Sequence, residues 1–301
     1  MPFNIFDAPV EQLDAELLAQ KKLSVSVLRL DQIHPVVSGN KLFKLHYFLA
    51  AALRSQHKTI LTFGGAYSNH LVATAFACRE NDLKCIGIVR GEKPATLSPT
   101  LQQCMHYGMQ LQFVARSVYD EKANEDFITG LQKEWGDCMV IPEGGYHPMG
   151  AKGAALIIDL AKEKGFTHIC TATGTATTVA GLLLNNNDTS VISVPVLKGM
   201  TDIEQRIHYL TGGNWKRDRL EVLDQYHFGG YAKKTPELLA FMNRLWQEHR
   251  LPTDFVYTAK LFYAVFDRIK NDRFPEGSQV LCLHTGGLQG NNSLPEGSLL
   301  F

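Results

Sequence analysis

The chain has 301 residues, of which 45% are hydrophobic and 20% are charged, and its 30 basic residues balance its 30 acidic ones. This composition indicates a globular protein with room for two domains, and it gives no reason to expect a nucleic-acid or membrane-surface partner. The first residues lack the basic and then apolar pattern of a leader, and no apolar run is long enough to cross a membrane. We therefore expect a cytoplasmic protein.

The six cysteines show no CxxC pair, and most of them lie in apolar runs. Such cysteines are typical of buried reduced thiols, so we expect no disulfide framework, no zinc site and no other metal. The positions are Cys78, Cys85, Cys104, Cys138, Cys170 and Cys282.

Strand-like and helix-like segments alternate along the chain. Short runs rich in Val, Ile and Leu predict strands at 23–30, 59–63, 84–89, 110–114, 138–141, 168–173, 190–194 and 279–284. Apolar residues at helical spacing predict helices at 42–53, 71–80, 98–108, 118–135, 150–164, 178–184, 199–210, 236–249 and 257–270. We expect a surface turn at 185–188 and a loose tail after Gln289. The alternation predicts an α/β fold of open parallel sheets with helices on both faces.

Ligands of open parallel sheets bind beyond the carboxyl ends of the strands. Four motifs of this chain, GGAYSNH, PEGG, GTATT and HTGG, each follow a predicted strand. The agreement between motif and topology predicts that these motifs meet at one site.

Lys41 lies at the start of a predicted helix, directly after the turn at Gly39. A lysine that is desolvated there, near other cationic donors, is partly neutral and nucleophilic, as a Schiff base requires. Lys44 lies three residues further on, close to the same helix face, where it can meet an anion. On this stretch alone, two solvated surface lysines are the alternative interpretation.

The small-residue turn at 174–178 lies between a predicted strand and a predicted helix. Its backbone N–H groups, the positive helix end and the threonine hydroxyls are typical of a phosphate site, although a plain strand–helix turn is the alternative. It is neither GxGxxG nor followed by GK[ST], which argues against dinucleotide and Walker sites. Ser68 and Asn69 offer a hydroxyl and an amide to a carboxylate or cofactor oxygen, with an N-cap as the alternative.

The motifs GNKLFKL, FGGAYSNH, IPEGG, GTATTVAGL and HTGG occur in this order. The series resembles the pyridoxal-phosphate enzymes of fold type II, which are tryptophan synthase β-like. Within them it is most similar to the branch of 1-aminocyclopropane-1-carboxylate (ACC) deaminase and D-cysteine desulfhydrase, over about 27–287. The resemblance implies a large cofactor domain of 1–44 plus 146–301, a small inserted domain of 45–145, pyridoxal 5′-phosphate as cofactor, and a homodimer.

The resemblance also implies roles for single residues. Lys41 would form the Schiff base with the cofactor, Lys44 would touch its phosphate, and Asn69 would bond its ring hydroxyl. The phosphate cup would consist of Gly174, Thr175, Ala176, Thr177 and Thr178, where Ala176-Thr177 replaces a Gly-Gly that is frequent in the family.

The substrate would face Ser68, Asn69 and His70, with Ser68 near its carboxylate or active in proton transfer. Tyr231 and Tyr257 match two active-site tyrosines of the branch, with ordinary half-buried aromatics as the alternative. Glu143, in IPEGG, is either a site residue or a loop carboxylate.

Thr258 and Thr285 distinguish the two activities of the branch. ACC deaminases carry a glutamate where Thr258 stands, and that carboxylate keeps the pyridine nitrogen protonated. A threonine hydroxyl can bond this nitrogen but cannot hold a charge there. Thr285 likewise resembles the desulfhydrases. The weaker electron sink favours elimination of a good leaving group.

The implied function is a pyridoxal-phosphate-dependent lyase or deaminase of a small amino acid. The first expectation is β-elimination from D-cysteine to pyruvate, ammonia and sulfide. The alternatives are ACC deamination to 2-oxobutanoate and ammonia, a β-replacing or dehydratase activity, and a non-catalytic protein that binds pyridoxal phosphate.

Overall fold

The computed structural model describes residues 8–55, 57–161, 165–185 and 188–301. Its strands form two sheets, one of six strands in the order β1-β2-β10-β7-β8-β9 and one of four in the order β5-β4-β3-β6. All neighbouring strands are parallel except β1 and β2. The predicted α/β fold of open parallel sheets is therefore confirmed.

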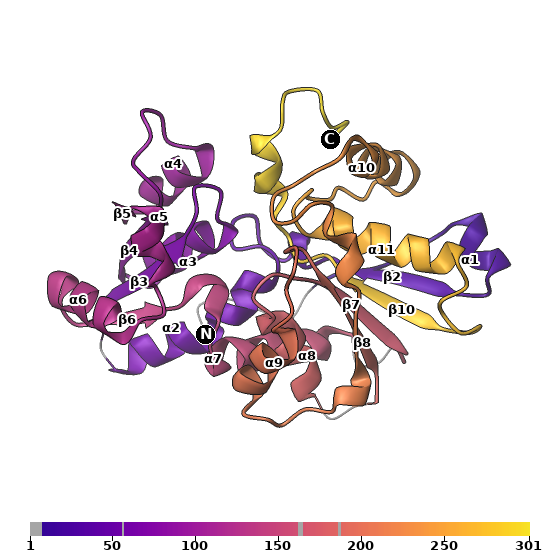
Figure 1. Ribbon diagram of the computed structural model, residues 1–301, viewed down its shortest axis with the longest axis horizontal. Helices are drawn as coiled ribbons and strands as arrows, with labels where there is room; N and C mark the ends of the chain where they lie inside the picture. The colour runs from indigo at the N-terminus through magenta and orange to yellow at the C-terminus, as the bar shows by residue number, and fades with distance from the viewer. Residues whose placement is uncertain (1–7, 56, 162–164, 186–187) are drawn as a thin grey trace.

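The six-stranded sheet contains β1 (Val10–Leu13), β2 (Ser24–Leu28), β7 (His168–Thr173), β8 (Ser190–Pro195), β9 (Leu220–Val222) and β10 (Gln279–Leu283). The four-stranded sheet contains β3 (Thr59–Gly64), β4 (Lys84–Arg90), β5 (Met109–Val114) and β6 (Cys138–Ile141). In Figure 1 the two sheets lie at opposite sides of the molecule, with α2 and α7 near its centre.

The helices are α1 (Glu16–Gln20), α2 (Asn40–Ser55), α3 (Asn69–Arg79), α4 (Pro99–His106), α5 (Arg116–Asp120), α6 (Glu125–Trp135), α7 (Pro148–Ala155), α8 (Thr177–Leu184), α9 (Ile203–Thr211), α10 (Pro236–His249) and α11 (Thr258–Lys270). Short 3₁₀ turns include η2 (Glu143–Gly145), η3 (Leu156–Leu160) and η7 (Leu288–Ser293). Among the residues that the structure describes, no helix is long and apolar enough to cross a membrane.

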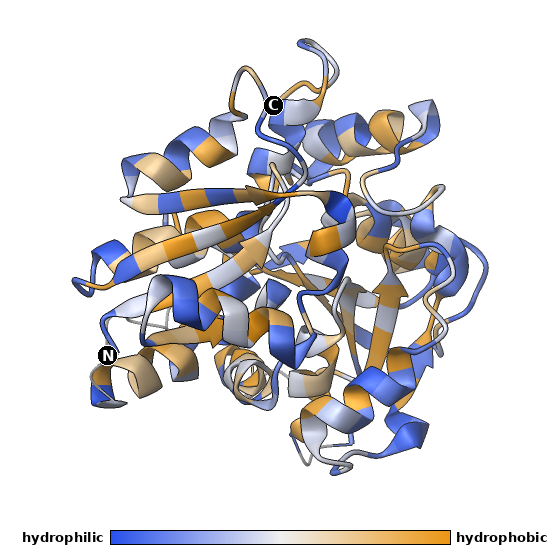
Figure 2. Cartoon of the chain, turned by 60° about the vertical axis from the view of Figure 1, so that its left-hand side comes forward, coloured by the Kyte–Doolittle hydropathy of each residue, from blue (hydrophilic) through white to orange (hydrophobic). Residues whose placement is uncertain are grey.

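One apolar core continues from the small sheet to the large one through α2, α3, α7 and α8. Separate clusters cover the other faces, with α11 on the large sheet and Tyr119 and Leu131 on the small one. Figure 2 shows strands that are mostly hydrophobic between helices with alternating hydrophilic and hydrophobic residues. Each sheet is thus covered on both faces, which is why its strands are almost continuously apolar.

Glycines allow α2, α7 and α8 to approach one another closely. A Cβ at Gly153 of α7 would lie 2.0 Å from the carbonyl oxygen of Phe43 in α2. A Cβ at Gly181 of α8 would lie 2.6 Å from the Cβ of Ala154 in α7. This packing fixes the N-terminus of α2 and that of α8 relative to each other.

Several predicted elements are corrected by the structure. The helix expected at 118–135 is two helices, because the side chain of Asn124 caps α6 by accepting from the N–H of Asp126 at 2.8 Å. The helix expected at 150–164 gives way to η3 after Ala155, and 162–164 lie outside the described residues, as do 186 and 187 of the expected turn. The sequence did not indicate β1, α1 or β9, which are only three to five residues long.

The expected loose tail after Gln289 is also wrong. The Asn291 side chain donates to the carbonyl oxygen of Thr253 at 2.9 Å and accepts from the N–H of Phe255 at 3.2 Å. Further along, the Phe301 ring lies 5.5 Å from that of Trp246 in α10. The tail is ordered because its polar side chains satisfy buried backbone groups and its last apolar residues pack on α10.

Candidate active site

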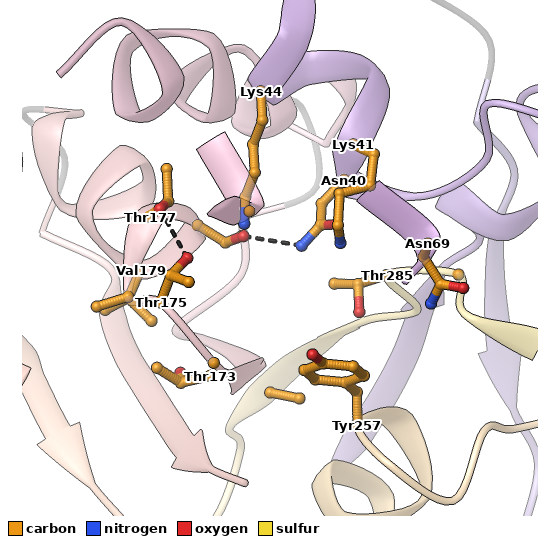
Figure 3. Close-up of a pocket in the computed structure, with 16 residues that line it drawn as sticks. Asn40, Lys41, Lys44, Asn69, Thr173, Thr175, Thr177, Val179, Tyr257 and Thr285 are labelled. Carbon is orange, nitrogen blue, oxygen red and sulfur yellow. Dashed lines mark hydrogen bonds between the residues drawn. The ribbon is translucent and has the colours of Figure 1, made fainter. Parts of the chain in front are cut away.

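A pocket opens beyond the carboxyl ends of β7 and β10, at the N-termini of α2 and α8 (Figure 3). It is lined by Asn40, Lys41, Lys44, Asn69, Gly144, Ala172, Thr173, Gly174, Thr175, Ala176, Thr177, Thr178, Val179, Tyr257, Thr285 and Gly286. The structure thus brings together most of the residues predicted from the motifs. Ser68, His70, Tyr231 and Thr258 are not among the lining residues.

The segment before Lys41 is held against the end of β10. Gly39 has φ +72°, and a Cβ there would lie 2.0 Å from the carbonyl oxygen of Thr285. The N–H of Asn40 donates to the same oxygen at 3.4 Å. Glycine is required here because no side chain fits this approach and this left-handed backbone.

Lys41 and Lys44 are desolvated amines on the same side of α2. Burial lowers the pKa of Lys41 to about 8, and the charge of Asp254 opposes this effect. Lys44 is 5% exposed, and burial together with the charge of Lys41 lowers its pKa well below the usual lysine value. The first amine is therefore partly neutral near neutral pH, and no anion among the described residues compensates the burial of the second.

Asn40 connects Lys41 with the turn at 174–178, a contact that the sequence analysis missed. Its Oδ1 accepts from Lys41 Nζ at 2.7 Å, and its Nδ2 donates to Thr178 Oγ1 at 2.9 Å. An asparagine before a lysine at a helix start resembles an ordinary cap, so its sequence position does not reveal this bridge.

The turn at 174–178 forms a concave cup of small residues. A Cβ at Gly174 would approach Tyr257 Cε1 to 3.3 Å, and Ala176 adopts the left-handed conformation with φ +64° at the start of α8. Thr175 and Thr177 share a hydrogen bond of 2.9 Å between their hydroxyls. Backbone N–H groups, hydroxyls and the positive end of α8 together make a site for a phosphate.

Ser68 and Asn69 lie where α3 begins. The Ser68 hydroxyl caps α3 by accepting from the N–H of Leu71 at 3.3 Å. Asn69 lines the pocket, and its buried Oδ1 has no hydrogen-bond partner among the described residues. A buried acceptor without a partner is costly, so this oxygen is suited to a hydroxyl donor from a ligand.

His70 does not face the pocket as predicted. It is 3% exposed, and its Nε2 lies 2.9 Å from the hydroxyl of Thr62, which itself donates to the carbonyl oxygen of Ile141. The hydroxyl therefore accepts from His70 Nε2–H. Burial and the charges of Lys41 and Lys44 lower the pKa of His70 to about 3, so this histidine is neutral. His70 follows Asn69 in α3, and its side chain is turned towards β3 rather than into the pocket.

Tyr257 lines the pocket, whereas Tyr231 is 53% exposed beside it. Their hydroxyls lie 3.5 Å apart and their ring centroids 6.0 Å apart. The buried Lys260 donates to the carbonyl oxygen of Gly230 at 2.8 Å and thereby holds the loop of Tyr231. Burial raises the pKa of Tyr257 well above its usual value, so its hydroxyl keeps its proton.

Glu143 precedes the lining residue Gly144 and is half-buried. Its carboxylate lies 3.6 Å from Lys122 Nζ. This pairing fits either of the two interpretations offered by the sequence.

Thr258 occupies another place than the sequence indicated. It is fully buried, its hydroxyl donates to Asp254 Oδ1 at 2.8 Å, and it accepts from the N–H of Asp254 at 2.8 Å. Its only proton is thus used within the chain. The structure does not show the direct contact predicted for Thr258, and of Thr258 and Thr285 only Thr285 lines the pocket.

A family model described as pyridoxal-phosphate dependent enzyme matches residues 4–286 of the chain. The chain belongs to this family. It is accordingly a pyridoxal-phosphate-dependent enzyme with the fold of the fold type II members. The alternative of a non-catalytic binding protein is not supported by this membership.

Relatives of this pyridoxal-phosphate-dependent enzyme carry both names of the branch. A protein of Pyrococcus abyssi named "Putative 1-aminocyclopropane-1-carboxylate deaminase" is 29% identical over 302 residues, covering 95% of this chain and 90% of the relative. A D-cysteine desulfhydrase of Serratia proteamaculans is 26% identical over 287 residues, covering 86% of each. The crystal structure of an ACC deaminase homologue superposes with a TM-score of 0.80 at 26% identity, covering 96% of this chain and 92% of that one.

The pocket fits pyridoxal phosphate on its own chemistry. The cup at 174–178, with the desolvated Lys44 beside it, matches a phosphate, and the partly neutral Lys41 matches an aldehyde. The unpartnered Oδ1 of Asn69 matches a hydroxyl. The cofactor thus offers a phosphate, an aldehyde and a hydroxyl to these three groups.

Proposed function

We propose that this enzyme releases pyruvate, ammonia and sulfide from D-cysteine by β-elimination. The observation that carries the proposal is the wall next to Lys41, where Thr285 offers a hydroxyl and no Asp or Glu is among the described lining residues. When bound, pyridoxal phosphate withdraws electrons from the substrate Cα, and it does so most strongly when a carboxylate holds a charge on its ring nitrogen. A hydroxyl cannot hold that charge, so a reaction with a good leaving group is favoured.

The residues divide into three roles under this proposal. Lys41 would hold the cofactor covalently, and its amine, once displaced by the amino group of the substrate, would take the proton from the substrate Cα. Lys44 and the cup residues Gly174, Thr175, Ala176, Thr177 and Thr178 hold the phosphate, and Asn69 holds the ring hydroxyl. Ser68, Asn69, Tyr231 and Tyr257 face the substrate, with Thr285 at the ring nitrogen.

The bond changes balance without a further reactant except water. The Cα–H bond breaks as Lys41 accepts the proton, and the Cβ–S bond breaks as thiolate leaves and is protonated to sulfide. One water then replaces the nitrogen, so that D-cysteine and water give pyruvate, ammonia and sulfide.

ACC deamination to 2-oxobutanoate is the second candidate. It is favoured by the name of the Pyrococcus abyssi relative and by the ACC deaminase homologue of known structure. Ring opening lacks a stabilised leaving group, so it depends more strongly on the electron sink than thiol elimination does.

We further propose the organisation that the resemblance implies. The small domain would comprise 45–145, which includes the whole four-stranded sheet, and 1–44 plus 146–301 would form the cofactor domain. A cytoplasmic location agrees with six buried free cysteines. A homodimer is testable by sedimentation equilibrium.

The test compares D-cysteine, L-cysteine and ACC as substrates of the purified holoenzyme. We expect sulfide and pyruvate in equal amounts from D-cysteine, and little 2-oxobutanoate from ACC, measured by sulfide colorimetry and mass spectrometry of the keto acids. Thr285→Val should reduce elimination, whereas Thr100→Val, a buried threonine of α4, should not. Abundant 2-oxobutanoate from ACC, with D-cysteine inert, would overturn the proposal in favour of the second candidate.

A further inference from the structure

Asp254 is a carboxylate that is 1% exposed and caps α11 directly behind the pocket. Its Oδ2 accepts from the N–H groups of Val256 at 3.0 Å and Tyr257 at 2.9 Å. Its Oδ1 accepts from the N–H of Thr258 at 2.9 Å and from its hydroxyl at 2.8 Å. Burial raises the pKa of Asp254 above its usual value, and the hydrogen bonds from Thr258 and Tyr257 and the charge of His284 oppose this effect.

The carboxylate is close to the pocket but separated from it by backbone. A Cβ at Gly287 would lie 3.3 Å from Asp254 Oδ1 and 3.0 Å from Asn69 Nδ2, so Gly287 lies between these two side chains. Tyr257, whose N–H binds Asp254, lines the pocket (Figure 3). The charge of Asp254 therefore acts on the pocket through a thin layer of buried atoms, where screening by water is weak.

Asp254 is the carboxylate whose charge raises the pKa of Lys41. On α2 the amine lies beside Lys44, whose pKa is lowered by burial and by the charge of Lys41, and on α3 it lies near the neutral His70. Asp254 itself faces Lys41, Lys260 on α11, and His284 after β10. Among the described residues, no ion pair joins Asp254 directly to Lys41.

We propose that Asp254 is a positioning residue that acts as the counter-charge of Lys41 from behind the pocket wall. Lys41 must lose a proton to react with an aldehyde and must accept one from a substrate. A direct salt bridge would hold the amine as ammonium, whereas full burial without an anion would hold it neutral. A carboxylate that is one layer of atoms away stabilises the ammonium only partly, so both the neutral and the protonated amine are populated. The inference rests on the proposed role of Lys41.

The test titrates Lys41 without cofactor or substrate. The full-length protein, stripped of cofactor, is labelled with a trace of acetic anhydride at pH values from 6 to 10, and the acetylation of Lys41 is quantified by peptide mass spectrometry. Wild type should show an inflection near pH 8. In Asp254→Asn the lost negative charge should move the inflection to lower pH, by about one unit. At pH 7 such a shift raises labelling about fivefold.

Thr258→Val is the matched control, because it removes a hydrogen bond from the same cap but leaves the charge. It should keep the wild-type inflection. Asn and Ser both cap helices, so Asp254→Ser replaces Asp254→Asn if the latter does not fold. An unchanged inflection in the neutral variants, or an equal shift in Thr258→Val, would overturn the proposal.

A second readout is the pH profile of kcat/KM in the loaded enzyme. Its acidic limb should move to lower pH in Asp254→Asn, which a purely structural role of the cap would not produce. If the labelling shift appears but no substrate reacts, the proposed function fails while this inference stands.

Discussion

At the scale of single residues, the pocket contains polar groups that have no suitable partner among the residues that the structure describes. Among the described residues, Lys44 is a buried amine without an anion beside it, and Asn69 Oδ1 is a buried acceptor without a donor. Such groups cost free energy in the unliganded protein. The cost is recovered when a phosphate and a hydroxyl bind, which couples the stability of these positions to the cofactor.

Asn40 should be needed for tight cofactor binding although we assign it no chemical step. Asn40→Ala removes the acceptor of Lys41 Nζ and the donor to Thr178 Oγ1. A hydrogen bond to a charged group contributes about 1.5–3 kcal/mol, so the dissociation constant for pyridoxal phosphate should rise about tenfold or more. Fluorescence titration of the stripped protein measures this.

Asn81→Ala is the matched control, because it removes a side-chain hydrogen bond at the far end of α3, to the carbonyl oxygen of Ala77. It should leave the dissociation constant unchanged. Equal affinities of Asn40→Ala and wild type would show that the bridge is not used.

The sequence predicted the residues that follow strands and missed those that depend on tertiary contacts. Lys41, Lys44 and the cup at 174–178 could be placed because each belongs to a motif at a strand or helix boundary. Asn40 and Asp254 could not, because their roles depend on contacts with segments more than a hundred residues away or with the next helix. For the same reason Thr258 was assigned to the ring nitrogen, although its hydroxyl is held by Asp254.

At the scale of elements, the pocket is positioned by the contact of α2 with α7. Gly153 is needed at this contact, because a Cβ would lie 2.0 Å from the carbonyl oxygen of Phe43 and 3.5 Å from the Cα of Lys44. A larger residue must push α2 away and move Lys44 with it.

Gly153→Ala should therefore destabilise the fold by about 1–3 kcal/mol, as overpacking usually does, and should also weaken cofactor binding. Gly130→Ala in α6 is the control, since a Cβ there meets no atom within 4 Å. It should stabilise the protein by about 0.5–1 kcal/mol without affecting the cofactor. Urea unfolding and cofactor titration of both variants provide the comparison, and a stability of Gly153→Ala equal to wild type would contradict the close packing.

The elements that the sequence did not predict are short or depend on neighbouring segments. β1 has four residues and pairs antiparallel with β2 at the edge of the large sheet, so its register is set by β2 rather than by its own pattern. The break between α5 and α6 depends on the cap at Asn124. Longer periodic elements such as α10, predicted at 236–249, have the predicted bounds.

At the scale of the whole molecule, the two sheets share one apolar core through α2, α7 and α8. The pocket lies at the N-termini of two of these helices, so its buried charges act on the stability of the whole fold. Unfolding of the stripped protein should therefore report on the protonation of its buried lysines.

Lys44→Met should stabilise the protein without cofactor and weaken the complex with it. Burial lowers the pKa of Lys44 well below the usual value, so at pH 7 to 10 the unfolded chain binds more protons here than the folded one. The free energy of unfolding of wild type should thus rise with pH relative to Lys44→Met, and the advantage of the variant should fade near the unfolded lysine pKa of about 10.4. At pH 7 that advantage should be roughly 1–3 kcal/mol, because an apolar side chain replaces an amine that must lose its proton or its hydration when the chain folds.

The measurement is urea unfolding of stripped wild type and Lys44→Met at pH 7, 8, 9 and 10. Lys84→Met, at an exposed position of β4, should stay close to wild type at every pH because its charge is hydrated in both states. With pyridoxal phosphate present the order should reverse, since loss of a charge-assisted bond to the phosphate lowers affinity by about one to two decades. If the stability of wild type follows that of Lys44→Met at all four pH values, Lys44 is not a buried amine with a lowered pKa. If the variant retains full cofactor affinity, Lys44 does not bind the phosphate.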